Sequence, residues 1–374
     1  MSIVLNRVKG VIMLNYLKSY INQQPLKMIS YAEYMTVVLY HAQFGYYMKE
    51  GEKIGRGGDF ITTSNLADIF GGTLARWFSN LVRNEWVAPQ ICEIGAGNGR
   101  FAKAFLRAWY ASENPELTYY IVESSPYHLK VQNEKFDENW QVKQVENLDE
   151  IKGFKGLIFS NELFDALPVH VIKNQQGQLF EIMITMEDDE LIEKTIPLAN
   201  DQIIRFLEEY QIHIVEGHRM EISLQMEAMF SRIEQVLSEG VIVSVDYGYS
   251  NEEWQEPLRR EGSLRGYYKH KQMNHVLVHP GEMDITSHIH WDVLKKLGEK
   301  VGLHTVGKWR QDEFLLSIGI LDHLESHHDP NPFSEVNRRN REIRSLIMPN
   351  GISASFQVLV QEKNSNGRSK PIIG

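Results

Sequence analysis

The chain has 374 residues, of which 39 are Lys or Arg and 49 are Asp or Glu, so its formal net charge at pH 7 is −10. This length allows two domains or one large domain with insertions, and 43% hydrophobic with 24% charged residues excludes a disordered or collagen-like chain. The acidic balance disfavours a nucleic-acid partner. The single cysteine, Cys92, excludes an internal disulfide and a multi-cysteine zinc site, which predicts a reducing, cytoplasmic location.

Residues 1–88 are predicted to form a helical N-terminal segment. Apolar residues at helical spacing begin near Leu14 and Tyr34, and a strongly amphipathic helix follows Asn65, its predicted N-cap. The Gly-rich stretch before that helix ends in GDFITTS. The most apolar N-terminal stretch, Val4 to Leu17, is interrupted by polar residues, so we expect neither a membrane-spanning helix nor a membrane partner.

Short apolar strands alternate with helical segments in residues 89–362, which predicts an α/β fold with helices on both faces of a parallel sheet. The expected strands are Gln90–Ile94, Tyr119–Glu123, Val142–Glu146, Gly156–Ser160, Val241–Asp246, Leu303–Trp309 and Ser355–Glu362. Residues 363–374 are expected to form a tail.

Two intervals are too long for a plain strand–helix–strand connection. The first holds a helix, Ser223–Leu237, that we expect Gly240 to end, and leaves about 171–218 as an insertion after the fourth strand. The second, about 248–290, follows the fifth strand. Its polar composition, rich in His and Gly, is typical of a lid or a substrate loop.

The sharpest motif is EIGAGNG, from Glu93 to Gly99, which closes a strand and opens a helix. A dinucleotide fingerprint needs glycine at position 100, where Arg100 stands. The pattern E-x-G-x-G-x-G is typical of S-adenosyl-L-methionine (SAM) sites. Glu123 ends the next strand, where an acid can accept both ribose hydroxyls of an adenosine. The alternative is a tight turn beside a surface Glu123.

A second motif, IFSNELFDALPVH, follows the fourth strand, at the end of a parallel strand where ligands bind. Asn161, Glu162 and Asp165 emerge at that edge. Glu162 and Asp165 are three residues apart, so on a helical turn they share a face and could hold a cationic acceptor. The alternative is a helix N-terminus whose acids only complement the helix dipole, and these residues do not decide between the two.

Several histidines lie between positions 275 and 290, but no cysteine is near them and their spacing matches no metal-binding pair. We therefore expect no metal. Thr286 or Ser287 is predicted to cap a helix, with a histidine such as His288 facing the cleft.

Together these segments resemble the family of class I SAM-dependent methyltransferases that includes MidA and the mitochondrial complex I assembly factor acting as a protein-arginine methyltransferase. The resemblance covers about residues 30–305 and rests on GDFITTS with IFGG, EIGAGNG, IVESSPYHLKVQ, NELFDALPVH, VDYGY, and LRGYYKHK with HPGEMDITSHIHW. It implies a Rossmann-like, seven-stranded sheet whose last strand is antiparallel, with the helical N-terminal extension and the insertions after strands 4 and 5. Ala96 and Asn98 depart mildly from the family's commoner loop, ELGPGRG.

The resemblance implies SAM as cofactor and methyl transfer to a protein arginine nitrogen. The predicted cofactor-binding residues are Glu93, Gly95, Gly97, Gly99, Glu123, Asn147, Leu148 and Asn161, with Asn147 and Leu148 at the adenine. The predicted catalytic residues are Glu162 and Asp165, to hold a guanidinium, and Asp284 or His288, to take the released proton. A small-molecule acceptor, another protein atom, or a non-catalytic assembly factor that retains the fold remain alternatives. A homodimer is left open.

Overall fold

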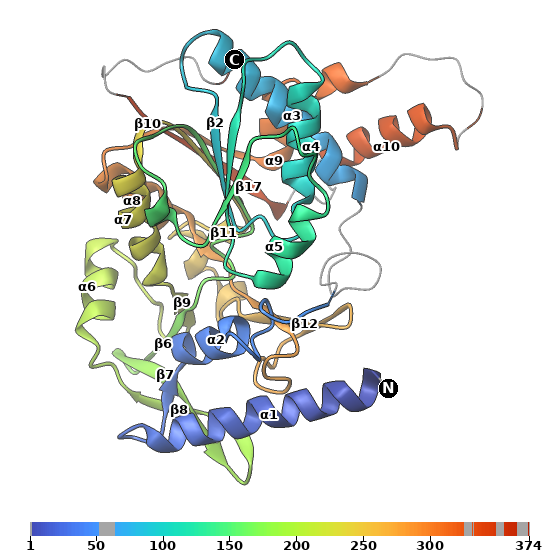
Figure 1. Cartoon of the computed structure of the whole chain (residues 1–374). Coiled ribbons are helices and arrows are strands. Elements are labelled where there is room, and N and C mark those ends of the chain that lie inside the picture. The colour runs from blue at the N-terminus through green and yellow to red at the C-terminus, as the bar shows by residue number, and fades with distance from the viewer. Residues whose placement is uncertain are drawn as a thin grey trace. The chain divides into compact units, whose positions relative to one another are not determined.

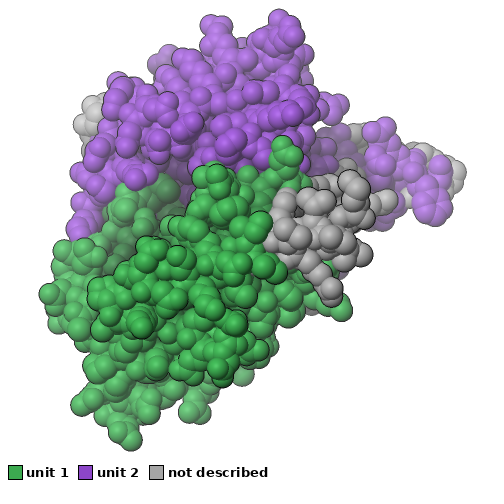
Figure 2. Space-filling view, turned by 60° about the horizontal axis from the view of Figure 1, so that its bottom comes forward, with its two compact units in different colours: residues 1–61, 164–229, 248–297 green, residues 62–163, 230–247, 298–374 purple. Residues whose placement is uncertain are grey.

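The computed structural model describes the backbone of residues 2–51, 64–324, 331, 333–348, 355–364 and 373. The expected GDFITTS loop lies outside the described residues, except for its last residue, Ser64. The chain divides into two compact units, which Figure 2 colours separately. Unit 1 comprises residues 1–61, 164–229 and 248–297, and unit 2 comprises residues 62–163, 230–247 and 298–374. Both segments expected as insertions fall in unit 1.

Unit 2 is built on a seven-stranded sheet. Its strands are β2 (Gln90–Ile94), β3 (Thr118–Val122), β4 (Val142–Val145), β5 (Phe154–Asn161), β10 (Leu237–Asp246), β16 (His304–Arg310) and β17 (Gln357–Lys363). They lie in the order β16-β17-β10-β5-β2-β3-β4. The strands from β10 to β4 run parallel, whereas β17 is antiparallel to both of its neighbours. This confirms the predicted α/β sheet and its antiparallel last strand.

The helical elements of unit 2 include α3 (Ser64–Arg83), α4 (Arg100–Tyr110), α5 (Pro126–Asn133), α9 (Gln311–Ser317), the 3₁₀ turn η4 (Ile320–His323) and α10 (Glu335–Ile347). Helices α3 and α4 pack side by side along the sheet (Figure 1). The ring of Phe78 lies 6.0 Å from that of Phe105 and 5.5 Å from that of Trp109, measured between centroids. These fully buried aromatics anchor the core that holds the α4 end of the glycine motif in place.

Three predicted helix boundaries are wrong. Asn65 lies inside α3, and α8 (Trp291–Lys300) begins beyond Thr286 and Ser287, so none of these residues is an N-cap. Helix α7 (Gln225–Val236) confirms the predicted helix, but Gly240 lies in β10 and does not end it. A Cβ on Gly240 would lie 2.0 Å from the carbonyl oxygen of Gly156 on β5. The glycine therefore permits two strands to approach closely.

Unit 1 contains a second, antiparallel sheet. Its strands are β1 (Ile29–Ser30), β6 (His170–Gln175), β7 (Gln178–Glu187), β8 (Glu190–Pro197) and β9 (Arg219–Ile222). The helices α1 (Ser2–Gln23), α2 (Tyr31–Tyr40) and α6 (Asp201–Glu209) belong to the same unit. Strand β1 pairs with β7 across more than 150 residues of chain, and residues 1–61 form one unit with the first expected insertion, whereas residues 62–88 of the predicted N-terminal segment belong to unit 2. Tyr34, Leu39 and Ile184 are fully buried in their common core.

The segment expected as a lid or substrate loop contains short strands. These are β11 (Gly248–Tyr249), β12 (Arg265–Tyr268), β13 (Lys271–Met273), β14 (Asp284–Thr286) and β15 (Ile289–His290), with the 3₁₀ turns η2 (Glu253–Gln255) and η3 (Pro257–Arg259). They form a three-stranded sheet, β13-β12-β14, and the pair β11-β15. Strands of two to four residues are too short to show an alternating pattern in the sequence. In the described part of the chain, no helix has the length and apolar character needed to cross a bilayer.

Candidate active site

The residues predicted to bind the cofactor lie at one edge of the sheet of unit 2. They come from four separate segments. Glu93 lies in β2, Glu123 follows β3, Asn147 follows β4 and Asn161 ends β5. Because these strands run parallel, their carboxyl ends meet at the same edge. Ligands of open α/β sheets bind at this edge.

The loop between β2 and α4 holds three glycines in left-handed backbone. Gly95, Gly97 and Gly99 have φ values of +74°, +51° and +72°, which residues with a Cβ rarely adopt. The Gly95 N–H donates to the carbonyl of Val122 (2.9 Å), which ties the loop to β3. Apart from Gly97 itself and its two neighbours in the chain, no heavy atom of the described residues lies within 4 Å of the place that a Cβ on Gly97 would take. A ligand can therefore approach the backbone closely at this glycine.

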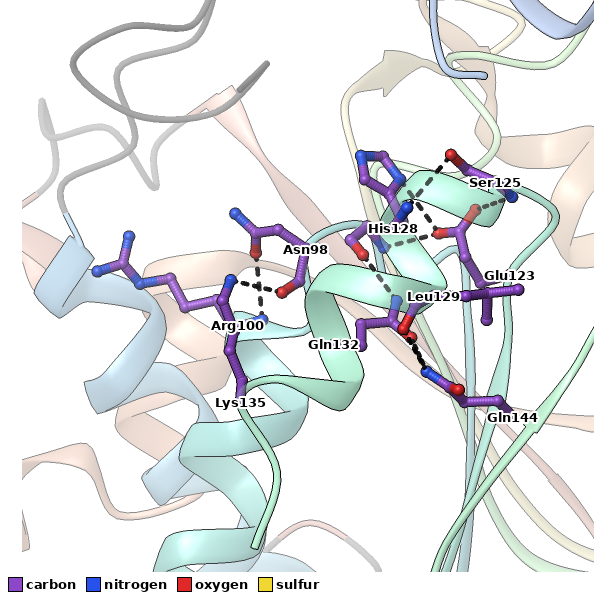
Figure 3. A network of polar contacts seen from close by, with 10 residues as sticks. Asn98, Arg100, Glu123, Ser125, His128, Leu129, Gln132, Lys135 and Gln144 are labelled. Atoms are coloured by element: carbon purple, nitrogen blue, oxygen red, sulfur yellow. Dashed lines mark hydrogen bonds and ion pairs between the residues drawn. The ribbon is translucent and has the colours of Figure 1, made fainter. Parts of the chain in front are cut away.

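The carboxylate of Glu123 connects the loop to the start of α5 (Figure 3). Its Oε2 accepts a hydrogen bond from the Gly97 N–H (3.0 Å) and its Oε1 accepts one from the Ser125 N–H (2.8 Å). The Nδ1 of His128 lies 3.6 Å from Oε2. Each carboxylate oxygen can accept two hydrogen bonds, so Glu123 retains capacity for a ribose hydroxyl. The ribose role stays a prediction.

Glu93 is a buried acid, 4% exposed, whose Oε2 accepts a hydrogen bond from the Tyr119 hydroxyl (2.7 Å). The pKa of the Glu93 carboxyl is raised to about 7, mainly by burial and also by the charge of Glu123, while the hydrogen bond from Tyr119 opposes this shift. Tyr119 was not among the predicted site residues. The sequence did carry a signal for Tyr119. Side chains alternate between the two faces of a strand, so Tyr119, four residues before Glu123, is expected on the same face as this acid.

We expect the Glu93 carboxyl to make the free energy of unfolding fall as the pH rises from about 4.5 to about 7. Because the pKa is raised in the folded protein, the folded state binds the proton more tightly than the unfolded chain in this window, and raising the pH favours unfolding. Glu93→Gln, which resembles the neutral acid, should remove this slope. Urea unfolding of the ligand-free proteins across the window measures it, and parallel curves would contradict the raised pKa.

Asn147 and Leu148 lie directly beyond β4, where Leu148 opens the 3₁₀ turn η1 (Leu148–Glu150). The Asn147 N–H donates to Oε1 of Glu150 (3.0 Å), which fixes the turn. The Asn147 side chain is exposed, and Leu148 is buried. The turn thus places a polar and an apolar side chain next to each other, as recognition of a flat heterocycle requires. The adenine role of both residues stays a prediction.

The end of β5 holds a non-glycine residue in left-handed backbone. Glu162 has a φ of +50°, a conformation that costs roughly 1–2 kcal/mol and that concentrates at functional sites. Its N–H donates to the carbonyl of Val245 (2.9 Å), and the amide of Asn161 donates to its Oε1 (3.1 Å). Water reaches the side chain, yet the surrounding protein raises the pKa of the Glu162 carboxyl, an effect that the Asn161 bond opposes.

Asp165, Asp284 and His288, the other predicted catalytic residues, belong to unit 1. The boundary between the units falls between Leu163 and Phe164, so Glu162 and Asp165 are in different units. The segment from Glu162 to Asp165 contains bends and the start of a turn, with no helix. The predicted shared helix face and the helix-dipole alternative are therefore both wrong, while the roles of the two acids stay predictions.

Two tyrosines lie close to the acids of unit 1. The Tyr47 hydroxyl donates to Oδ1 of Asp284 (2.5 Å), and the Tyr40 hydroxyl donates to the carbonyl of Ala166 (2.8 Å). Burial and then the charge of Asp284 raise the pKa of Tyr47 well above its usual value, and Tyr40 and Asp165 add to this shift. The structure thus brings Asp165 and Asp284 near one hydroxyl. No motif in the sequence pointed to Tyr47.

His288 stacks on Tyr249, with ring centroids 4.6 Å apart and an interplanar angle of 3°. The guanidinium of Arg259 lies 4.1 Å from the centroid of the same tyrosine ring. The pKa of His288 is lowered to about 4, mainly by burial and also by the charges of Arg265 and Arg259. The imidazole is therefore neutral at pH 7 and is a weaker proton acceptor than an ordinary histidine.

Other histidines of this segment contact protein groups. His279 stacks on Tyr268 (4.2 Å between centroids) and His290 on Trp254 (4.7 Å). His290 Nε2 donates to the carbonyl of Glu221 (2.9 Å). Within the described residues, no group of three or more His, Cys, Asp or Glu side chains is arranged to hold a metal ion.

A family of S-adenosyl-L-methionine-dependent methyltransferases matches residues 73–308 of this chain. Among solved structures, one from Burkholderia thailandensis that contains S-adenosyl-homocysteine is similar to this structure with a TM-score of 0.86 and 26% sequence identity, covering 96% of this chain and 93% of that one. A second structure from the same organism has a TM-score of 0.83, 26% identity and the same coverage.

Curated relatives support the same relationship. The Drosophila melanogaster relative, named protein arginine methyltransferase NDUFAF7 homolog, mitochondrial, is 27% identical over 326 residues, which are 77% of this chain and 70% of the relative. The Danio rerio protein arginine methyltransferase NDUFAF7, mitochondrial, is 25% identical over 372 residues, 88% of this chain and 82% of the relative. The human one is 24% identical over 333 residues, 78% and 70% of the two chains.

These relatives contradict the prediction of a cytoplasmic location, because all three are named as mitochondrial proteins. The prediction rested on the single cysteine, which reports a reducing environment and does not separate the cytoplasm from other reducing compartments.

Proposed function

Because the chain belongs to this family of SAM-dependent methyltransferases, we propose that it methylates a nitrogen of an arginine side chain in a protein. The observation that carries the proposal is Glu162, an acid in strained backbone at the edge of the sheet. A carboxylate binds a guanidinium through charge-assisted, bidentate hydrogen bonds. The relatives named as protein arginine methyltransferases support the same acceptor.

In the proposed site, SAM is held at the carboxyl edge of the sheet of unit 2. The residues that would hold it are Glu93, Gly95, Gly97, Gly99, Glu123, Asn147, Leu148 and Asn161. Two observations fit the cofactor. The loop leaves open space beside its middle glycine, and the next strand ends in a carboxylate that can accept from hydroxyl groups.

The bound cofactor supplies a methyl group on a positively charged sulfur. Glu162 would hold the guanidinium so that one nitrogen faces this methyl group, and such positioning removes much of the entropic part of the barrier. As the N–C bond forms and the S–C bond breaks, the attacking nitrogen gives up one proton, so the product guanidinium keeps a single positive charge. The protein must therefore provide a carboxylate for the cation and an acceptor for one proton.

Asp165 is proposed to bind the guanidinium, and Asp284 or His288 to take the proton. The Tyr47 hydroxyl donates a hydrogen bond to Oδ1 of Asp284 and so orients this carboxyl group. His288 is neutral at pH 7 because its pKa is lowered to about 4. The neutral imidazole can accept a proton, and a comparison of Asp284→Asn with His288→Asn in the pH dependence of kcat separates the two candidates.

Incubating the protein with methyl-labelled SAM and a lysate of its host cells tests the acceptor. We expect the label in a protein, and acid hydrolysis of that protein should release labelled methylarginine. The same lysate without added enzyme is the control. Label in the small-molecule fraction, or in an amino acid other than arginine, would contradict the arginine proposal and leave the methyltransferase activity intact.

A further inference from the structure

The chain around helix α5 holds both central carbonyl groups of the glycine loop (Figure 3). Nε2 of Gln132 donates to the Gly97 carbonyl (2.7 Å), and Nζ of Lys135, two residues beyond α5, donates to the Asn98 carbonyl (2.7 Å). The Gln132 side chain is fully buried. These are long-range contacts, since more than 30 residues of chain separate each donor from its carbonyl.

The contacts come from one face of the helix and its flanks. Ser125 and His128 lie against the Glu123 carboxylate, and Gln132 and Lys135 follow at steps of four and three residues. Residues spaced by three and four share a helix face. This face therefore contacts Glu123 at one end and the glycine loop at the other.

Gly97 is held on both sides of its Cα. Its N–H donates to Glu123 and its carbonyl accepts from Gln132. A Cβ on Gly99 would lie 2.7 Å from Cγ of Gln132, so the same side chain also excludes a larger residue at the loop's last glycine. Gly97 has a φ of +51°, a region that glycine adopts readily, and these two contacts hold its backbone there.

The orientation of the Gly97 and Asn98 carbonyls determines which backbone groups the loop presents on its opposite side. In a trans peptide the C=O and the following N–H point in opposite directions. With the Gly97 carbonyl turned toward Gln132, the Asn98 N–H points to the other side of the loop. An N–H on that side suits the carboxylate of an amino acid, whereas a carbonyl there would repel it.

We propose that Gln132 and Lys135 are positioning residues, which hold the glycine loop in the conformation that binds the amino-acid part of SAM. The proposal rests on the cofactor placement given above and is independent of the acceptor. It predicts that substitutions of these two residues weaken the binding of ligands that carry the amino-acid part and have little effect on the binding of ligands that lack it.

The test compares Lys135→Met and Gln132→Met with Lys130→Met, which removes an exposed lysine from the same helix. Calorimetry gives the Kd of each protein for SAM, for S-adenosyl-homocysteine and for methylthioadenosine, which keeps the nucleoside and lacks the amino-acid part. We expect the first two ligands to bind about tenfold more weakly to the Lys135 and Gln132 variants. Methylthioadenosine should bind them as it binds the wild type, and Lys135→Arg should restore most of the affinity.

Two results would overturn the proposal. One is SAM binding by both variants with the Kd of Lys130→Met. The other is an equal loss for all three ligands together with a lower free energy of unfolding in urea, which would indicate general damage to the fold. Failure of the cofactor placement is distinguishable, because Glu123→Gln would then bind SAM as tightly as the wild type.

Discussion

Glu162→Gln is expected to lower kcat by about 10²–10³-fold while the Kd for SAM stays within about twofold of the wild-type value. The amide keeps the size of the side chain and its place at the end of β5, but it loses the charge that holds a guanidinium. The raised pKa of the Glu162 carboxyl adds a second expectation. Protonation at lower pH should reduce the activity of the wild type, and the variant should lack this acid limb.

Single-turnover methylation of a labelled acceptor, with calorimetric titration of SAM, measures both quantities. Glu113→Gln is the matched control, since it removes an exposed carboxylate elsewhere in unit 2. Turnover of Glu162→Gln equal to that of the control would exclude Glu162 as the group that holds the acceptor. A weakened SAM Kd with normal turnover at saturation would place Glu162 with the cofactor instead.

Glu123→Gln is expected to raise the Kd for SAM by about 100-fold or more. The substitution weakens the hydrogen bonds that hold the glycine loop and the proposed hydrogen bonds to the nucleoside. The carboxylate accepts hydrogen bonds from the N–H groups of Gly97 and Ser125. A glutamine amide has only one accepting oxygen, so its –NH2 group would face one of these two donors. Loss of hydrogen bonds to a charged group costs about 1.5–3 kcal/mol each.

The control for this variant is Glu134→Gln, which changes the same charge at an exposed position beside α5. Circular dichroism and urea unfolding should show that Glu123→Gln is folded, since the carboxylate lies at the edge of the sheet and outside the apolar core. An unchanged SAM Kd in a folded Glu123→Gln protein would remove this residue from the cofactor site.

The sheet of unit 2 was predictable because its signals are local. Strand β2 was predicted with the bounds that the structure shows, and the glycine motif that follows it was assigned from its own residues. Glu123 was predicted as a cofactor-binding residue because an acid at the end of the second strand of such a fold commonly binds a ribose. Parallel strands bring such local motifs to one edge, so the topology assembled the predicted cofactor residues without further information.

The features that the sequence did not predict depend on contacts between segments that are distant in the chain. Strand β1 is only Ile29–Ser30 and becomes a strand by pairing with β7, which no local period can show. Tyr47 contacts Asp284, more than 200 residues away in the sequence, and Gln132 contacts the Gly97 carbonyl, so neither contact can be predicted from a local pattern. Gly240 was interpreted as the end of a helix because glycine commonly occupies that position. In the structure it instead allows two strands to approach closely, which is a less common use of glycine.

The division of the chain into interleaved segments has a consequence for its synthesis. The chain passes from one unit to the other after residues 61, 163, 229, 247 and 297. A growing chain on the ribosome therefore cannot complete unit 1 until residue 297 has emerged, and its buried α2 must wait for the β7 segment. The apolar faces of the early helices stay exposed during this time, and exposed apolar surface of this kind is prone to aggregation. No single truncation point yields either unit alone, so binding experiments need the full chain.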